Sequence, residues 1–286
     1  MAILYRLLIF VFVLLISMSN RANYMIQNDS NSTTMINKYK LNKEGKDFIN
    51  EIALAYKHEI VVIEKDLAVS EHGWSYIKDD VPTIEIDSKS NDKEDILIHE
   101  AYHIILKYIG FPSIRFEYPN TDKSDRNIIY LNWFGHLFWD KIEHYYFYPL
   151  MLSDLKMNPY NSLTIEIKEA ISKGKIEGLQ DATRKTTLAG YYLQVWIEIN
   201  DDKILKEFED FLITKYNGEG ITQGKELISI FKNNKISNSN DAISLFIKCF
   251  NLIHKSQNLI ISTTKIEKEQ HKNYTQIYAY FIIKPL

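Results

Sequence analysis

The chain has 286 residues, 45% of them hydrophobic, which is enough for one large domain or two small ones. A net charge of −3 and a sequence pI of about 6.3, with no basic stripe, argue against a nucleic-acid partner. The single cysteine, Cys249, excludes an internal disulfide, and its apolar neighbours favour a core role over a reactive thiol.

The first residues have the pattern of an export signal. An unbroken apolar run at residues 7–16 follows Arg6, and Ser17 and Ser19 supply the small residues of a cleavage site before Asn20. The run is shorter than the roughly 20 residues of a membrane span, although extending it over 2–18 gives an uncleaved anchor as the alternative. We therefore expect residues 1–19 to be a signal peptide or membrane anchor, and the protein to be exported: periplasmic, secreted or membrane-anchored. Abundant Ile, Lys and Asn indicate an AT-rich, bacterial genome.

The next stretch changes from polar to periodic. Residues 20–42 are rich in Asn and Ser and are predicted to be a linker. A helix is expected at about 43–57 and a strand at 59–63, followed by a loop or hairpin over 68–80. The alternating run 81–87, with Pro82 near its start, predicts a second strand.

A helix is predicted from about 92 to 109. Acidic residues fill its first turn, and Asn91 with Glu94 resembles a capping box. Gly110 and Pro112 mark its end. Near its middle lies the sequence His99-Glu100-Ala101-Tyr102-His103, which is HExxH.

The HExxH spacing is suited to metal binding. Positions i and i+4 place His99 and His103 on one helix face, where two imidazoles can hold one Zn²⁺ and Glu100 can reach a water on that metal. A random chain of this composition would contain the motif with a probability of roughly 0.015. Apolar neighbours on both sides of the motif argue against a solvated face that carries these residues by chance.

A second helix is expected at about 127–148, after a loop over 111–125 that contains Pro112 and Pro119. His136, Asp140 and Glu143 share one stripe of this aromatic helix. Polar groups so placed are costly to bury without partners, and a metal ion would satisfy them. The alternative is an amphipathic core helix whose polar stripe faces solvent.

With the HExxH helix and this second helix, the chain resembles the zincin superfamily of zinc metallopeptidases. The resemblance implies a third zinc ligand on the second helix, and Glu143 matches the glutamate of the gluzincin branch by type and position. His144 is the next candidate ligand and His136 the third. Asp140 fits better as a partner that orients a ligating imidazole.

Several signatures of known zincin branches are missing. The Asn-Glu-x-x-x-Asp of thermolysin-like enzymes and the Gly-Thr-x-Asp of aspzincins are absent. Leu106 and Gly110 stand where metzincins have Gly and His. The resemblance is therefore to a divergent gluzincin-like protein.

The resemblance also implies a mechanism. Zn²⁺ held by His99, His103 and Glu143 would lower the pKa of a bound water towards ~7, and Glu100 would act as general base on it and return the proton to the leaving amine. The substrate would be a peptide or protein, paired as an extended strand with an edge strand beside the HExxH helix, for which 81–87 is the candidate. Candidates for a second oxyanion donor are Tyr145, Tyr146, Tyr148 and His144.

The remainder of the chain is predicted to be mainly helical. We expect a late β-hairpin from strands at 259–263 and 274–283. The expected fold class is α+β: a minimal zincin core over residues 43–159, with a small sheet, the HExxH helix and the ligand helix, and a helical C-terminal region over 160–286. The predicted helices of that region are 163–173, 180–199, 201–216, 222–233 and 240–255.

Two other functions fit the sequence. One is a non-catalytic exported metal-binding or interaction protein that retains a zincin fold without turnover. The other is a membrane-tethered helical interaction protein in which HExxH is accidental. The intact Glu100 favours the peptidase, because a purely structural metal site needs no general base.

Overall fold

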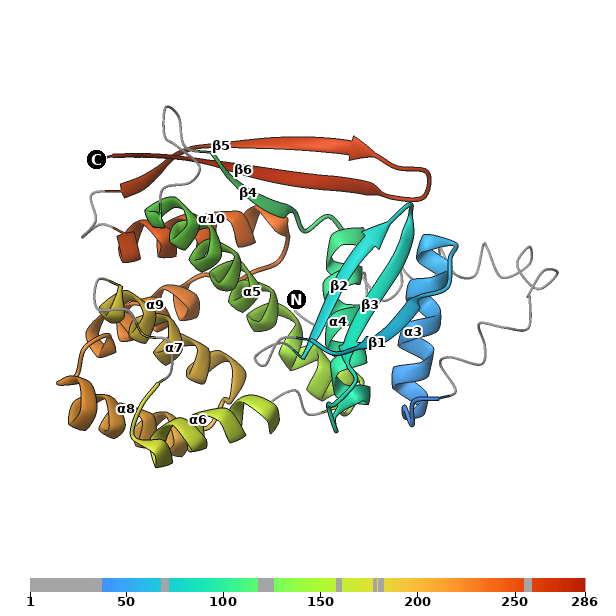
Figure 1. Cartoon of the computed structure of the whole chain (residues 1–286). Coiled ribbons are helices and arrows are strands. Elements are labelled where there is room, and N and C mark those ends of the chain that lie inside the picture. The colour runs from blue at the N-terminus through green and yellow to red at the C-terminus, as the bar shows by residue number, and fades with distance from the viewer. Residues whose placement is uncertain are drawn as a thin grey trace. The chain divides into compact units, whose positions relative to one another are not determined.

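A computed structural model describes residues 38–67, 72–117, 126–157, 161–176, 179, 183–254 and 259–285 (Figure 1). The predicted signal or anchor, 1–19, and most of the predicted linker lie outside these residues. In the described part, no helix is both long and apolar enough to cross a membrane. The described residues divide into two compact units: those within 1–110, 154–157 and 269–276 form the first, and those within 111–153, 158–268 and 277–286 form the second.

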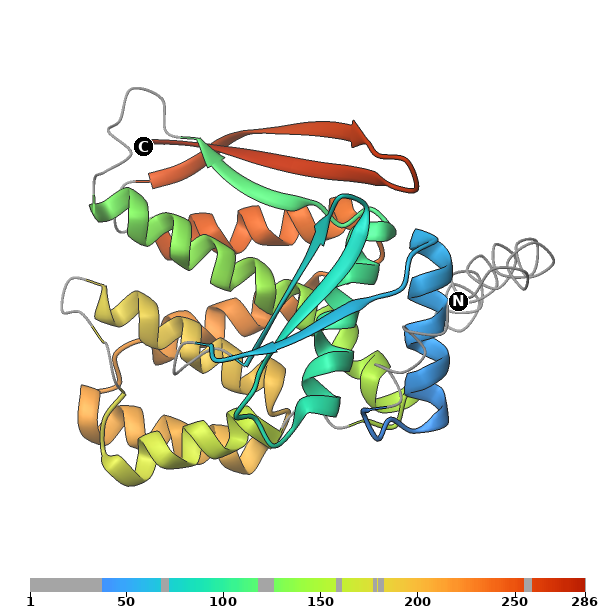
Figure 2. The ribbon, with the colours of Figure 1, turned by 45° about the vertical axis from the view of Figure 1, so that its right-hand side comes forward.

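The described residues of the first unit form a small mixed sheet and two helices (Figure 2). Its strands lie in the order β1-β3-β2, with β1 parallel and β2 antiparallel to β3. The predicted helices and strands are confirmed within about two residues, and a strand occupies the expected hairpin region. The elements are α3 (Lys43–Tyr56), β1 (Val61–Lys65), β2 (Gly73–Lys78), β3 (Val81–Asp87) and α4 (Lys93–Tyr108).

The edge-strand assignment from the sequence is wrong. Strand β3, residues 81–87, is the central strand, and β2 is an outer strand of the described sheet. Pro82 does not prevent this placement. It faces Ile77 of β2. Bonded and non-bonded pairs alternate along an antiparallel ladder, and the bonded His72–Asp87 position lies five positions away, so the Ile77–Pro82 pair exchanges no backbone hydrogen bonds. The missing N–H of Pro82 therefore costs no bond to β2.

The core of the first unit fixes α4 against the sheet. Ile84 and Ile86 of β3 and Ile98 and Ala101 of α4 are completely buried. The helix begins after Asp92, which makes no side-chain capping bond, so the predicted Asn91–Glu94 capping box is not formed. The Glu94 carboxylate instead accepts a hydrogen bond from the Lys40 backbone N–H at 3.1 Å.

The second unit is mainly helical and carries a second three-stranded sheet, ordered β4-β6-β5. The five helices predicted beyond residue 160 and the late hairpin are confirmed, with longer strands than expected. The elements are β4 (Ser113–Glu117), α5 (Arg126–Asp154), α6 (Asn161–Lys173), α7 (Arg184–Glu198), α8 (Asp202–Tyr216), α9 (Ile221–Asn233), α10 (Ser239–His254), β5 (Leu259–Gln270) and β6 (Thr275–Pro285).

Two features of the second unit differ from the sequence prediction. Strand β4 lies in the segment expected to be a loop, and it forms by parallel pairing with β6, where Ile114 faces Ala279 far along the chain. Helix α5 continues past Pro149 to Asp154. The proline removes one helical hydrogen bond, but the completely buried Met151 in the next turn favours continuation of the helix.

Glu64 provides a test of how β1 is joined to α4. Its carboxylate accepts hydrogen bonds from Lys38 and Lys93, which lower its pKa to about 2 from 4.5. The ionised Glu64 carboxylate therefore contributes its full stabilisation of the folded state above pH 4.5, and this contribution is lost as the pH falls through about 2. We expect Glu64→Gln to lower the free energy of unfolding by about 1 kcal/mol at pH 7, measured by urea denaturation. The exposed Glu226→Gln serves as control.

The difference between wild type and Glu64→Gln should shrink as the pH is lowered from 4.5 towards 2. A difference that is independent of pH would show that the charge of Glu64 does not stabilise this contact.

Candidate metal and catalytic site

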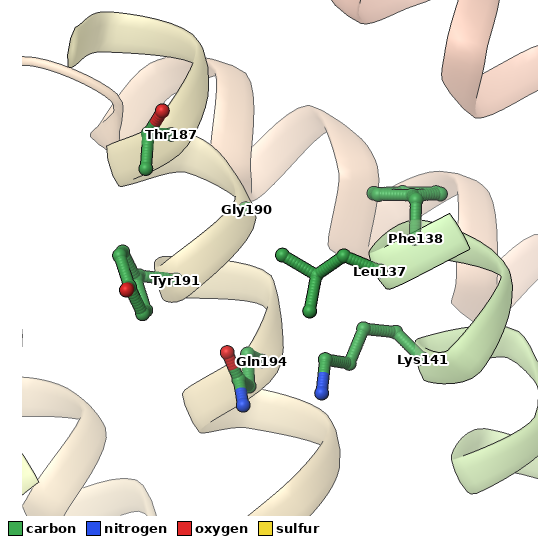
Figure 3. A pocket seen from close by; sticks show the side chains of 7 residues that line it. All are labelled: Leu137, Phe138, Lys141, Thr187, Gly190, Tyr191 and Gln194. Atoms are coloured by element: carbon green, nitrogen blue, oxygen red, sulfur yellow. The ribbon is translucent and has the colours of Figure 1, made fainter. Parts of the chain in front are cut away.

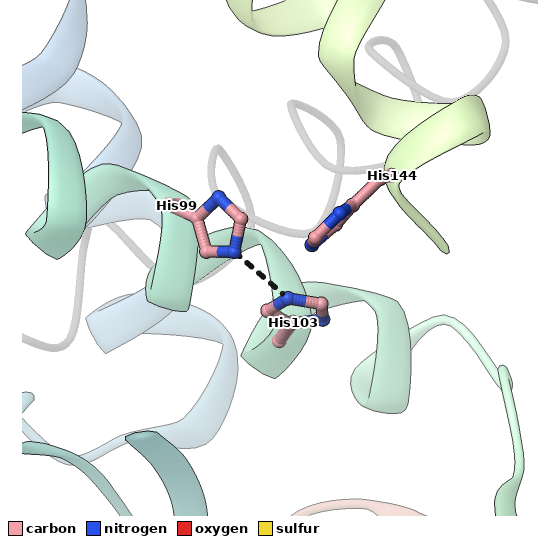
Figure 4. Close-up of side chains that lie close together, drawn as sticks. All are labelled: His99, His103 and His144. Atoms are coloured by element: carbon pink, nitrogen blue, oxygen red, sulfur yellow. Dashed lines mark hydrogen bonds between the residues drawn. The ribbon is translucent and has the colours of Figure 1, made fainter. Parts of the chain in front are cut away.

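Helix α4 holds the two histidines of the HExxH motif in register. The Nε2 atoms of His99 and His103 lie 3.2 Å apart (Figure 4). Two nitrogens bound to one tetrahedral Zn²⁺ at about 2.0–2.1 Å are separated by about 3.3 Å. The spacing of the two donor atoms is therefore compatible with a shared metal ion, and two imidazole nitrogens are among the donors that zinc accepts.

Glu100 lies beside the first residue of β2. Its side chain and that of His103 are almost entirely buried. A Cβ atom on Gly73 would lie 2.7 Å from Ile96 Cγ2 and 3.0 Å from Glu100 Cγ. Glycine at this position therefore lets β2 approach α4 closely at the predicted general base. The sequence indicated only a loop or hairpin glycine here.

In the second unit, His144 of α5 is buried and held on one side by a carboxylate. Its Nδ1 lies 2.6 Å from Glu198 Oε1, and its ring stacks on Tyr148 at 4.6 Å between centroids. A carboxylate only accepts hydrogen bonds, so we assign the proton to Nδ1. In a neutral ring Nε2 would then carry the lone pair, as in histidines that bind metals, and Asp140 Oδ1 lies 3.4 Å from this nitrogen.

The other α5 candidates have different surroundings. Glu143 is buried, and its Oε1 accepts a hydrogen bond from Trp139 Nε1 at 2.7 Å. Asp140 is half-exposed, with Oδ1 3.4 Å from His144 Nε2. His136 is exposed, and its ring packs edge-on against Phe116. Within its unit, the structure thus brings Asp140 and His144 together and leaves His136 at the surface.

A buried ionic group joins α5 to α7. We call Asp140, Lys141, His144 and Glu198 the Glu198 cluster. Glu198 Oε1 lies 2.5 Å from Lys141 Nζ, and Glu198 Oε2 accepts a hydrogen bond from Gln194. The ligand atoms of Asp140, His144 and Glu198 lie within 4.8 Å of one another, so these three residues could hold a metal ion. The Lys141 ammonium already supplies a cation to this group.

The charges of the cluster are mutually stabilised. Burial disfavours the Glu198 carboxylate, but Lys141 and His144 outweigh that effect and lower its pKa below the ordinary value. Burial likewise opposes the Lys141 ammonium, yet Glu198 and Asp140 raise its pKa. Neither Lys141 nor Glu198 was predicted from the sequence as a site residue. The sequence signal for Glu198 was its position directly after the apolar run at 195–197, inside a predicted helix.

A small cavity adjoins the cluster (Figure 3). It has room for about one water molecule, which is too small for a substrate cleft. It lies between α5 and α7, and its lining residues are Leu137, Phe138, Lys141, Thr187, Gly190, Tyr191 and Gln194.

Comparison with known proteins does not place the chain in a family. No protein-family model, no curated protein and no solved structure matches it.

Substitution of Lys141 tests the cluster. Lys141→Met leaves the buried Glu198 carboxylate without its ammonium, and we expect it to lower the free energy of unfolding by about 3–5 kcal/mol. Chemical denaturation followed by tryptophan fluorescence measures the change. Lys141→Met combined with Glu198→Gln should regain more than half of the loss, because no unpaired carboxylate remains. A single-variant loss below about 1 kcal/mol would show that the pair does not stabilise the α5–α7 contact.

Proposed function

We propose that the protein is a zinc-dependent metallopeptidase, a divergent gluzincin-like member of the zincin superfamily. The observation that supports this most directly is the 3.2 Å approach of His99 Nε2 and His103 Nε2, with the buried Glu100 next to His99 on the same helix. Stable helix structure and a packed core hold all three residues, as a catalytic site requires. The sheet beside α4 is consistent with a minimal zincin core.

The proposed third ligand comes from α5. Catalytic zinc usually has three protein ligands and one open position. Glu143 is the ligand that the resemblance implies, and its contact with Trp139 would orient the carboxylate. His144 is the alternative, supported by the Glu198 carboxylate on its Nδ1. Asp140 is proposed to orient a neighbouring side chain.

The chemistry of the site follows from Glu100. When bound, zinc would supply Lewis acidity towards a water molecule and the scissile carbonyl. Glu100 would accept the proton released by the attacking water and transfer it to the nitrogen of the leaving amine. Burial protects this carboxylate from bulk water, which favours directional proton transfer over exchange with solvent. Tyr145, Tyr146, Tyr148 and His144 stay candidates for a second oxyanion donor.

Strand β2 supports an extended peptide as the substrate. It is an outer strand of the described sheet, and its first residue lies against Glu100. An outer strand can bind a peptide through main-chain hydrogen bonds. We propose that β2, in place of the 81–87 strand expected from the sequence, serves this purpose. Export of the enzyme is proposed on residues 1–19 alone.

The test of this function is the Glu100→Gln variant. Glutamine keeps the size of the side chain but cannot accept the proton, so we expect peptide cleavage to fall by about 10²–10⁴-fold while bound zinc is unchanged. Cleavage of a mixed fluorogenic peptide library and zinc analysis are measured on the same samples. Glu94→Gln, on the same helix outside the motif, serves as the matched control.

Two outcomes would change the account. Full cleavage by Glu100→Gln would rule out Glu100 as the general base. Wild-type protein that binds zinc but cleaves no peptide would support the non-catalytic metal-binding protein instead.

A further inference from the structure

One edge of β2 offers main-chain hydrogen-bonding groups beside Glu100. The Asp87 backbone N–H donates to the His72 carbonyl at 2.9 Å, so His72 and every second residue after it turn their backbone groups towards β3. Gly73, Ser75 and Ile77 therefore turn theirs away from β3. The Ser75 carbonyl accepts a bond from Lys107 Nζ at 3.3 Å, which is consistent with this orientation.

The side chains of β2 alternate between two environments. Gly73 faces α4, so Trp74 and Tyr76 lie on the opposite face of the sheet, which we call the outer face. The Trp74 side chain is 51% exposed. In the same row across the sheet lie Glu85 of β3 and Ile63 of β1, which is 38% exposed.

The outer face has little uncompensated charge near Trp74. The Glu85 carboxylate is 2.6 Å from Lys65 Nζ and accepts a hydrogen bond from Tyr76 at 3.0 Å. Both oxygens of Glu85 thus have partners among the described residues, and the exposed apolar surface of this row comes from Trp74 and Ile63. A side chain placed there would be favoured by apolar contact with the indole ring.

We propose that Trp74 is a specificity residue that selects an apolar side chain in a substrate strand added to the outer edge of β2 in the described sheet. This rests on the proposed peptidase function. A strand paired with Gly73, Ser75 and Ile77 places alternate side chains on the outer face beside Trp74, as in any extended pairing. The Ser75 carbonyl has two lone pairs, so it can accept from a peptide N–H while Lys107 is bound.

The position of Glu100 defines which substrate residue meets Trp74. Glu100 borders Gly73, so the scissile bond lies at the Gly73 end of β2. Antiparallel pairing, the more stable arrangement, brings the peptide in from the Lys78 end. The selected side chain then belongs to a residue on the amino side of the scissile bond, within about two residues of it.

Cleavage of a peptide library by three proteins tests this assignment. We expect wild type to prefer aromatic and branched aliphatic residues over Ser, Asp and Gly at one position on the amino side by about tenfold. Trp74→Ser should reduce that preference below about threefold. Ile63→Ser is the matched control: it removes an exposed apolar side chain from the same row, but on the far strand β1.

Three results would overturn the proposal. The preference for apolar residues could persist in Trp74→Ser, or Ile63→Ser could remove it equally. It could also lie only on the carboxyl side of the scissile bond. Each of these outcomes leaves the peptidase function standing if Glu100→Gln is inactive. A parallel measurement uses fluorescence polarisation of labelled apolar and polar peptides bound to Glu100→Gln. If wild type cleaves no peptide, the peptidase function fails, and the Trp74 dependence of this binding still decides whether the β2 edge selects apolar peptides.

Discussion

Two imidazole nitrogens held 3.2 Å apart on one half-buried helix set the constraint on which the proposed function of this protein depends. Nitrogen atoms at this distance must share a proton or a metal ion, because their lone pairs otherwise repel. The packing of α4 against β2 and β3 fixes the helix, and the i, i+4 spacing fixes the two rings on it. Glu100 follows from the same geometry, since it lies next to His99 and is covered by Gly73 of β2.

The second constraint is the burial of charge between α5 and α7. Lys141 and Glu198 lie at 2.5 Å with almost no solvent exposure, and desolvation of two such groups is repaid only by close pairing and further hydrogen bonds. His144 and Gln194 supply those bonds. This arrangement fixes the His144 ring. A histidine fixed through Nδ1 by a carboxylate is suited to present Nε2 to a metal, which is why His144 competes with Glu143 as the proposed ligand.

Local sequence patterns predicted much of this fold. Helix α3 has an Asn42 cap whose side chain accepts from the Gly45 N–H, and Gly110, two residues after the end of α4, has a φ of +97°. These signals lie within a few residues of the elements they define. Strand β4 could not be found in the same way, because its partner β6 is more than 150 residues away. The strand order β1-β3-β2 could not be predicted either, because it depends on how the strands pair and not on the sequence of any one strand.

In the candidate site, too, local sequence patterns were predictable and long-range contacts were not. His99, Glu100 and His103 are readable because their spacing is local. Glu198 and Gly73 act through contacts with residues distant in the sequence, at His144 and Glu100, so their importance appears only in the folded chain.

The most direct test of the central claim is the zinc content of purified, metal-reconstituted protein. Wild type should bind about one zinc per chain. His99→Ala should lose the zinc. Either Glu143→Ala or His144→Ala, whichever removes the third ligand, should lose it as well. His271→Ala, a histidine outside both candidate helices, should retain it. Absence of zinc from wild type, or undiminished zinc in His99→Ala, would contradict the assignment of HExxH as a metal site and would leave the chain without a basis for metallopeptidase chemistry.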